Sequence, residues 1–154
     1  MKYVDASALL RVLFTELGPS VPLAAPGRVV SSQLVGVETA RAIDRERLLG
    51  HLDDAETAVK RKELTDVLAM LDLAPVDDAV IERAKSPFAV NVRALDAVHV
   101  ATAEVLAAEA AEPLEFWTHD ERQAAAALSR GLAVRGVHIG DAASPDPPSD
   151  GAGG

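Results

Sequence analysis

Short apolar segments rich in β-branched residues alternate along the chain with longer stretches of helical periodicity. This alternation is typical of a parallel sheet that helices cover on both faces. We therefore predict an α/β protein, a three-layer α/β/α sandwich around a parallel sheet of about five strands. The expected strands are 2–4, 28–31, 73–76, 114–118 and 133–137. The expected helices are 6–17, 32–48, 51–71, 77–85, 94–111 and 120–130.

The length and composition indicate one folded domain followed by a polar tail. A chain of 154 residues can bury about two-thirds of its unfolded surface in a single core. It contains no cysteine, which excludes a disulfide framework and a thiolate zinc site. We expect a domain at 1–140 and a disordered tail at 141–154, because the tail is rich in Pro, Gly, Asp and Ser and has almost nothing to bury.

The net charge of −9 argues against a broadly basic surface for nucleic acid, because non-specific affinity for nucleic acid comes mainly from phosphate neutralisation. It does not exclude a nuclease, since carboxylates that bind a divalent cation also count as negative. The sequence contains no signal peptide and no apolar run of about 18 residues that could span a bilayer. A soluble cytoplasmic protein with no membrane attachment is therefore expected.

The first acidic candidate is Asp5, which directly follows the first expected strand. Open α/β sheets usually place their ligand sites at the carboxyl ends of the strands. Asp5 and Ser7 are also good N-cap residues for the helix that follows, so capping is the alternative interpretation. A further role for Asp5 depends on whether other carboxylates reach the same edge.

The second candidate is Glu38, within SSQLVGVETARAI. The apolar spacing places it on or beside the buried stripe of a helix. A glutamate at such a position is rarely buried without a partner. The alternative to a functional role is a salt bridge with Arg41 or Arg45.

Two further acids come late in the chain. Asp96, in RALDAVHVATA, stands in or just before the first turn of an Ala-rich helix, and Asp120 follows the fourth expected strand. Either residue can serve as a helix cap. Since Asp120 and Asp5 both follow parallel strands, we expect them at the same edge of the sheet.

Together the four acids predict a cation site. Carboxylates within about 4 Å of one another repel by roughly 4 kcal/mol per pair at an effective dielectric constant of about 20. Such a cluster implies either a bound cation or raised pKa values. Ligands that are all oxygen suit Mg²⁺ or Mn²⁺.

The motifs YVDASALL, SSQLVGVETARA, LDAVHVATA and FWTHD occur in this order over residues 1–138. The set resembles the PIN domain family and, most closely, its VapC-type toxins from toxin–antitoxin pairs. The resemblance implies an α/β/α sandwich, an acidic Mg²⁺ or Mn²⁺ site and endoribonuclease activity. Carried over by motif position, the catalytic and metal-binding acids are Asp5, Glu38, Asp96 and Asp120.

Other residues follow from the same hypothesis. Ser7 and Thr118 match the hydroxyl residues of the first and fourth motifs, and we expect them to donate hydrogen bonds to the acids. His119 departs from the family pattern, and we expect a solvated side chain there. The arginines that we expect to contact the phosphate backbone, with an ordinary solvated role as the alternative, are Arg11, Arg41, Arg45 and Arg93.

The resulting hypothesis is hydrolysis of RNA, with tRNA among the candidate substrates, by one or two divalent ions that activate water. The resemblance also implies a cognate antitoxin that covers the acidic groove. The amphipathic segment 50–71 and the first helix are the candidates for this contact and for a homodimer. The rival hypothesis is a PIN-like domain that binds RNA or protein without significant nuclease activity.

Three other classes fit the sequence poorly. A phosphoacceptor receiver domain needs a lysine after its last strand, whereas the last lysine here is Lys85. Aspartate-based phosphohydrolases carry a second Asp two residues after the nucleophilic one, where this chain has Ser7. No G-x-G-x-x-G motif follows a strand, so there is no dinucleotide site to argue for.

Overall fold

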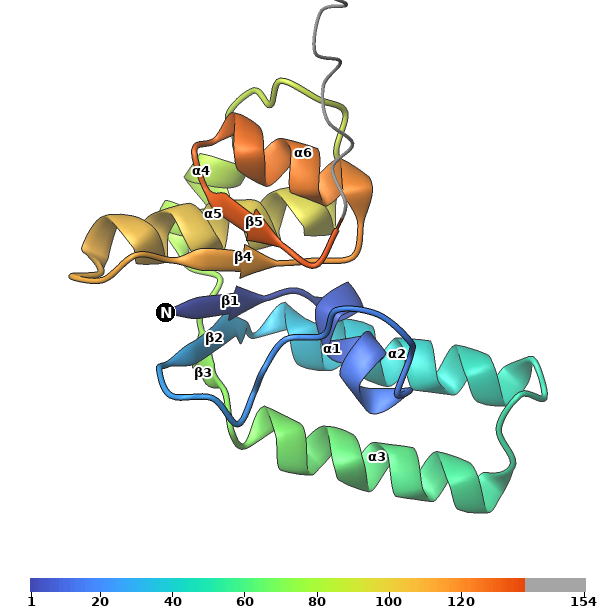
Figure 1. Ribbon diagram of the computed structural model, residues 1–154. Helices are drawn as coiled ribbons and strands as arrows, with labels where there is room; N and C mark the ends of the chain where they lie inside the picture. Colours follow the sequence, from blue (N-terminus) through green and yellow to red (C-terminus); the bar gives the residue numbers. More distant parts are fainter. Residues whose placement is uncertain (138–154) are drawn as a thin grey trace, which may run out of the picture.

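The computed structural model of the protein describes residues 1–137. Within this range the predicted order of strands and helices is confirmed (Figure 1). The strands are β1 (Lys2–Val4), β2 (Val29–Ser32), β3 (Asp72–Ala74), β4 (Glu115–Trp117) and β5 (Ala133–Arg135). The helices are α1 (Ala6–Leu13), α2 (Leu34–Leu48), α3 (Asp54–Leu68), α4 (Asp78–Lys85), α5 (Ala94–Glu109) and α6 (Glu121–Ser129). The predicted tail at 141–154 lies outside the described residues.

The predicted ends of two helices were wrong. Helix α1 ends at Leu13 instead of residue 17, because Thr15 has a φ of 52° and takes the chain out of the helical region. Helix α3 begins at Asp54 instead of residue 51, because Asp53 caps it. The Asp53 side chain accepts a hydrogen bond from the Glu56 N–H, and the Glu56 side chain accepts one from the Asp53 N–H.

The strands form one parallel sheet in the order β3-β2-β1-β4-β5. From the central strand β1, the chain continues to β2 and β3 on one side of the sheet and returns later to β4 and β5 on the other. The loops after β1 and β4 therefore leave the sheet in opposite directions. A crevice at the carboxyl ends of these two strands is the usual ligand site of an open α/β sheet.

Two apolar clusters pack against the sheet, one on each face. Val4 of β1 belongs to the first cluster, with residues of α1, α2 and α3, and Tyr3 belongs to the second, with residues of α5 and α6. The separation follows from the pleat, because successive side chains of a strand point to opposite faces. Helix α4 packs on α5. These layers confirm the predicted α/β/α sandwich. Within residues 1–137, no helix combines the length and apolar character needed to cross a membrane.

The burial of α1 leads to a stability prediction. Leu9 is 0% exposed in the first cluster, whereas Leu17 is 95% exposed. Leu9→Ala should lower the free energy of unfolding by about 2–5 kcal/mol, since it leaves a cavity in the core. Leu17→Ala should change the same quantity by less than about 0.5 kcal/mol. Urea unfolding of both variants measures the difference, and equal losses would contradict the packing of α1.

Candidate active site

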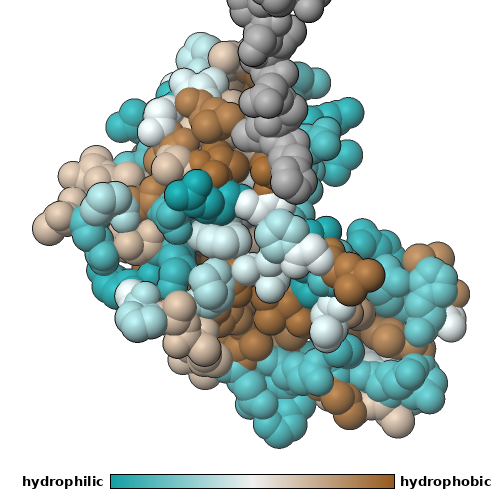
Figure 2. Space-filling view, viewed as in Figure 1, coloured by the Kyte–Doolittle hydropathy of each residue, from teal (hydrophilic) through white to brown (hydrophobic). Residues whose placement is uncertain are grey.

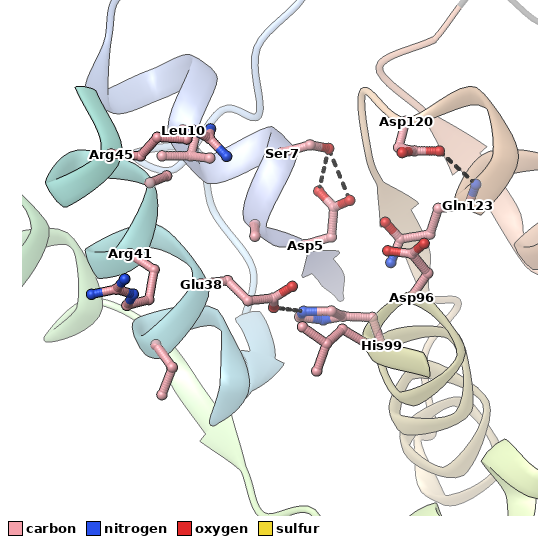
Figure 3. Close-up of a pocket in the computed structure, with 14 residues that line it drawn as sticks. Asp5, Ser7, Leu10, Glu38, Arg41, Arg45, Asp96, His99, Asp120 and Gln123 are labelled. Carbon is pink, nitrogen blue, oxygen red and sulfur yellow. Dashed lines mark hydrogen bonds and ion pairs between the residues drawn. The ribbon is translucent and has the colours of Figure 1, made fainter. Parts of the chain in front are cut away.

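A pocket with a volume of about 410 Å³ opens at the carboxyl edge of the sheet. The loop after β1, helix α2, the start of α5 and the loop after β4 contribute its walls (Figure 3). The structure brings all four predicted acids to this pocket: Asp5, Glu38, Asp96 and Asp120. They come from segments far apart in the sequence, and the order of the strands is what gathers them.

Asp5 is the most buried of these acids, with 1% of its surface exposed. It caps α1, since its Oδ1 accepts a hydrogen bond of 2.8 Å from the Ala8 N–H. The Thr118 hydroxyl donates to Oδ2 at 2.6 Å, and the Ser7 hydroxyl lies 2.8 Å from both carboxylate oxygens. Burial raises the pKa of the Asp5 carboxyl, although these hydrogen bonds act in the opposite direction.

The two hydroxyl residues also join the strand ends to each other. The Ser7 oxygen accepts a hydrogen bond of 2.8 Å from the His119 N–H, and the Thr118 oxygen accepts one of 3.0 Å from the Asp120 N–H. The loop after β1 and the loop after β4 are thus held together around the Asp5 carboxylate. Both predicted hydroxyl residues lie beside an acid, as their sequence positions suggested.

Asp120 and Asp96 lie at the beginnings of two helices. Asp120 caps α6, with Oδ1 accepting hydrogen bonds from the N–H groups of Arg122 at 2.8 Å and Gln123 at 3.0 Å. Asp96 is in the first turn of α5, but the N-cap is Arg93. Burial raises the pKa of the Asp96 carboxyl, and the negative charge of Asp120 raises it further. These two carboxylates therefore act on each other electrostatically.

Glu38 forms a contact that the sequence did not suggest. Its Oε2 lies 2.6 Å from Nε2 of His99, a residue of α5 with 1% of its surface exposed. The alternative of a salt bridge with Arg41 or Arg45 is wrong, because Arg41 pairs with Asp44 and Arg45 with Glu46. Sequence reasoning missed His99. The signal available was its spacing, since it stands one helical turn after Asp96 and so on the same face.

Sequence reasoning was wrong about His119 and missed Gln123, two polar side chains near the acids. His119 is not solvated: both of its ring nitrogens are buried without a hydrogen-bond partner among residues 1–137, and burial lowers the pKa of its imidazole. The reason is tertiary, since Gly136, just after the neighbouring strand β5, packs against the imidazole. Gln123 lines the pocket and was also missed; its amide nitrogen is buried without a partner in the described part of the chain.

The predicted arginines are distributed around the site. Arg41 and Arg45 line the pocket, on the side of α2 (Figure 3). Arg93 lines an adjoining depression of about 270 Å³ that shares Asp96 and Asp120 with the pocket. Arg11 lines neither depression, and its Nε lies 3.5 Å from a carboxylate oxygen of Glu16. The acids are therefore flanked by positive charge on two sides.

The donor set fits a hard divalent cation, because four carboxylates supply oxygen ligands of the kind that Mg²⁺ and Mn²⁺ prefer. As the side chains are oriented, no three His, Asp or Glu residues within 1–137 lie close enough to hold one ion together. Asp5, Glu38 and Asp120 each face a hydrogen-bond donor of the protein instead. An ionised carboxylate has about four acceptor sites, so these bonds leave capacity for a cation.

A five-stranded parallel sheet with four acids at the carboxyl edge of its central strands defines a protein of the PIN domain class. The sequence pattern of the PIN domain matches residues 2–131, and the chain belongs to this family. A curated relative, Ribonuclease VapC46 of Mycobacterium tuberculosis, is 33% identical over 135 residues, which cover 86% of this chain and 94% of the relative. The predicted family and the likeness to VapC-type toxins are thereby confirmed.

The raised pKa of Asp96 predicts how stability depends on pH. In the folded state this carboxyl holds its proton more tightly than in the unfolded chain, where the pKa is about 3.9. The metal-free protein should therefore lose stability as the pH rises from about 3.9 through the folded pKa. Asp96→Asn cannot ionise, so it should lack this loss and be more stable than the wild type at neutral pH.

Urea unfolding across this pH range, in the presence of a chelator, measures the effect. Asp66→Asn is a matched control, because Asp66 is an exposed acid that pairs with Lys62 on α3, and its change should remain below about 0.5 kcal/mol. An Asp96→Asn variant with the same pH dependence as the wild type would show that Asp96 carries no electrostatic strain.

Proposed function

We propose that this protein is a VapC-like toxin, an endoribonuclease that hydrolyses RNA phosphodiester bonds with Mg²⁺ or Mn²⁺ held by its four acids. The observation that carries the proposal is the convergence of Asp5, Glu38, Asp96 and Asp120 on one pocket. Similarity to a relative named as a ribonuclease supports the same reaction. The cytoplasm is the proposed place of action, since the substrate is RNA.

Asp5 and Asp96 are the proposed direct metal ligands. Asp5 is fixed by its capping bond and by two hydroxyl groups, so its carboxylate is already oriented. Asp96 is destabilised by the neighbouring charge of Asp120, and a divalent cation would relieve that repulsion. When bound, such an ion lowers the pKa of the attacking water and stabilises the charge that develops on the phosphate.

Glu38 and Asp120 complete the proposed site. Either residue would bind the ion directly or through water, or orient the attacking water. Asp120 lies at the positive end of the α6 dipole, so its own charge is stabilised there. No side chain is needed as a nucleophile. Ser7 and Thr118 act through Asp5, since their hydroxyl groups keep its carboxylate in one orientation.

Arginines on both sides of the acids support binding of an RNA backbone. Arg41 and Arg45 flank the pocket along α2, and Arg93 flanks the adjoining depression. All three residues are exposed, which leaves the guanidinium groups able to reach phosphate oxygens. The net charge of −9 is therefore compatible with RNA binding, because the positive charge is local.

Cleavage of RNA by the purified protein tests the proposal. Total RNA and a purified tRNA pool are incubated with Mg²⁺, with Mn²⁺ or with a chelator. We expect discrete products that require metal and that disappear with Asp96→Asn, since an amide is a poor substitute for an anionic metal ligand. Asp66→Asn, which changes an exposed acid that does not line the pocket, should cleave like the wild type.

The possible results separate the two candidate functions. Cleavage that persists with chelator or in Asp96→Asn would contradict the proposed mechanism. A folded protein that binds metal but cleaves no RNA would favour the rival function, a PIN-like module that binds RNA or a protein partner.

A cognate antitoxin and a homodimer are also part of the proposal. Helices α2 and α3 form an arm that extends from the sheet (Figure 1), and the arm exposes apolar side chains that include Leu48 at 69%, Leu49 at 61% and Val59 at 55%. Figure 2 shows apolar patches between hydrophilic residues on this part of the molecule. The acidic pocket itself would attract a basic side chain of an antitoxin.

The dimer has a direct test on the arm. Val59→Lys places a charge beside a shallow apolar depression that Leu52 and Ala55 also line. Burying a valine contributes about 1.5–3 kcal/mol, so the dimer dissociation constant should rise by about tenfold or more. Sedimentation equilibrium measures this constant, with Leu128→Lys on α6, where the leucine is 44% exposed, as the control outside the arm. A wild-type monomer, or an unchanged constant in Val59→Lys, would refute this contact.

A further inference from the structure

A chain of buried hydrogen bonds leads from the sheet to Glu38. The Ser32 N–H donates to the Tyr3 hydroxyl at 3.2 Å, and that hydroxyl lies 2.7 Å from Nδ1 of His99. The other ring nitrogen, Nε2, lies 2.6 Å from Oε2 of Glu38. Tyr3 and His99 are 0% and 1% exposed, so water does not compete for these bonds. The chain connects β2, β1 and α5 to a carboxylate on α2.

The donors and acceptors give this chain a direction. Burial raises the pKa of the Tyr3 phenol, which therefore keeps its proton. The Tyr3 oxygen accepts from the Ser32 N–H. The Glu38 carboxylate can only accept, so Nε2 of His99 is the donor in the 2.6 Å contact between them. In a neutral His99 the other ring nitrogen, Nδ1, then accepts from the Tyr3 O–H.

The two rings are also fixed by packing. The Tyr3 ring stacks on Phe116 of β4 with centroids 5.1 Å apart, and it meets the His99 ring edge-on at 5.9 Å. His99 is therefore held by both of its nitrogens and by an aromatic neighbour. Glu38, in contrast, has a long side chain that is 21% exposed. A rigid donor at one of its oxygens limits the directions in which this carboxylate can point.

We propose that His99 is a positioning residue, which Tyr3 orients and which holds the Glu38 carboxylate toward the pocket for metal binding. This inference rests on the proposed function, since it assigns Glu38 to the metal site. Figure 3 shows His99 reaching from α5 across the pocket to Glu38 on α2. His99 itself does not bind the metal, because its Nε2 is occupied by Glu38 and its Nδ1 by Tyr3.

Two substitutions at one position separate this role from simple core packing. In His99→Asn the side-chain amide lies near the place that Nδ1 occupies in the wild type. There the amide can still bond to the Tyr3 hydroxyl, but it cannot reach Glu38. Gln is one methylene longer, and its amide N–H can reach the place of Nε2. If His99 positions Glu38, His99→Asn should release that carboxylate and His99→Gln should retain it. A packing role predicts instead that both polar substitutions have similar effects.

The experiment has a readout that needs neither metal nor RNA. In the metal-free protein, NMR measures the side-chain rotamers of Glu38 and the protonation of each nitrogen of His99. We expect one dominant Glu38 rotamer in the wild type and in His99→Gln, rotamer averaging in His99→Asn, and a proton on Nε2 but not on Nδ1. A fixed Glu38 in His99→Asn, or a proton on Nδ1, would overturn the inference.

Calorimetric titration with Mn²⁺ gives the second readout. Removal of a group that orients a metal ligand weakens affinity by about 10–100-fold, and we expect about tenfold for His99→Asn with most of the affinity kept in His99→Gln. In a Glu38→Gln background, His99→Asn should add no further loss, because it acts through Glu38. Additive losses would overturn the inference.

Thr39→Val is a matched control, because Thr39 is buried and directly follows Glu38 in the sequence. Among the described residues, its hydroxyl bonds to carbonyl oxygens of α2. This variant should therefore bind Mn²⁺ like the wild type.

The two readouts also separate this inference from the proposed function. A wild-type protein that neither binds Mn²⁺ nor cleaves RNA refutes the metal-dependent nuclease, whereas the NMR rotamers still decide whether His99 positions Glu38. If the wild type and His99→Asn bind Mn²⁺ with the same affinity, the proposed function stands and the positioning role of His99 is refuted.

Discussion

The parallel pairing of β1 with β4 is the constraint on which the site depends. These two strands are neighbours in the sheet, although one lies near the beginning of the domain and the other near its end, and Val4 pairs with Trp117. Asp5 and Thr118 directly follow these paired residues, and the hydrogen bond between them is 2.6 Å long. A shift of this register would separate the hydroxyl from the carboxylate and turn the strand side chains to the wrong faces. The gathering of the acids in one pocket is thus a consequence of strand order.

The same pocket shows a conflict between stability and function. Burial raises the pKa values of both Asp5 and Asp96, and the negative charge of Asp120 raises that of Asp96 further. The protein compensates with its own donors, which include the Thr118 hydroxyl, the N–H groups at the start of α6 and His99. These donors offset part of the cost of gathering the carboxylates and leave acceptor sites for a cation. Buried acidic groups that cost stability in this way are expected at functional sites.

Local signals accounted for the elements and for most of the acids. The alternation of strands and helices was predicted in order, and Asp5, Asp53 and Asp120 stand where the caps of three helices occur. What local signals could not supply was the partner of a side chain. The alternative for Glu38 was a salt bridge with Arg41 or Arg45, whereas its side chain contacts His99, which is 61 residues away in sequence. His119 was expected in water, but both of its ring nitrogens are buried and Gly136 lies against the ring.

The sequence by itself therefore determined the fold class, the family and the four acids, because periodicity, capping residues and motif order are written in neighbouring positions. Only the tertiary structure decided how those acids are held. The Tyr3–His99–Glu38 chain and the Asp5–Thr118 bond join residues that meet only when the sheet has formed and α5 has packed on it. A hydrogen bond requires two groups at one distance and angle, and for groups this far apart in sequence it is the assembled sheet that sets both.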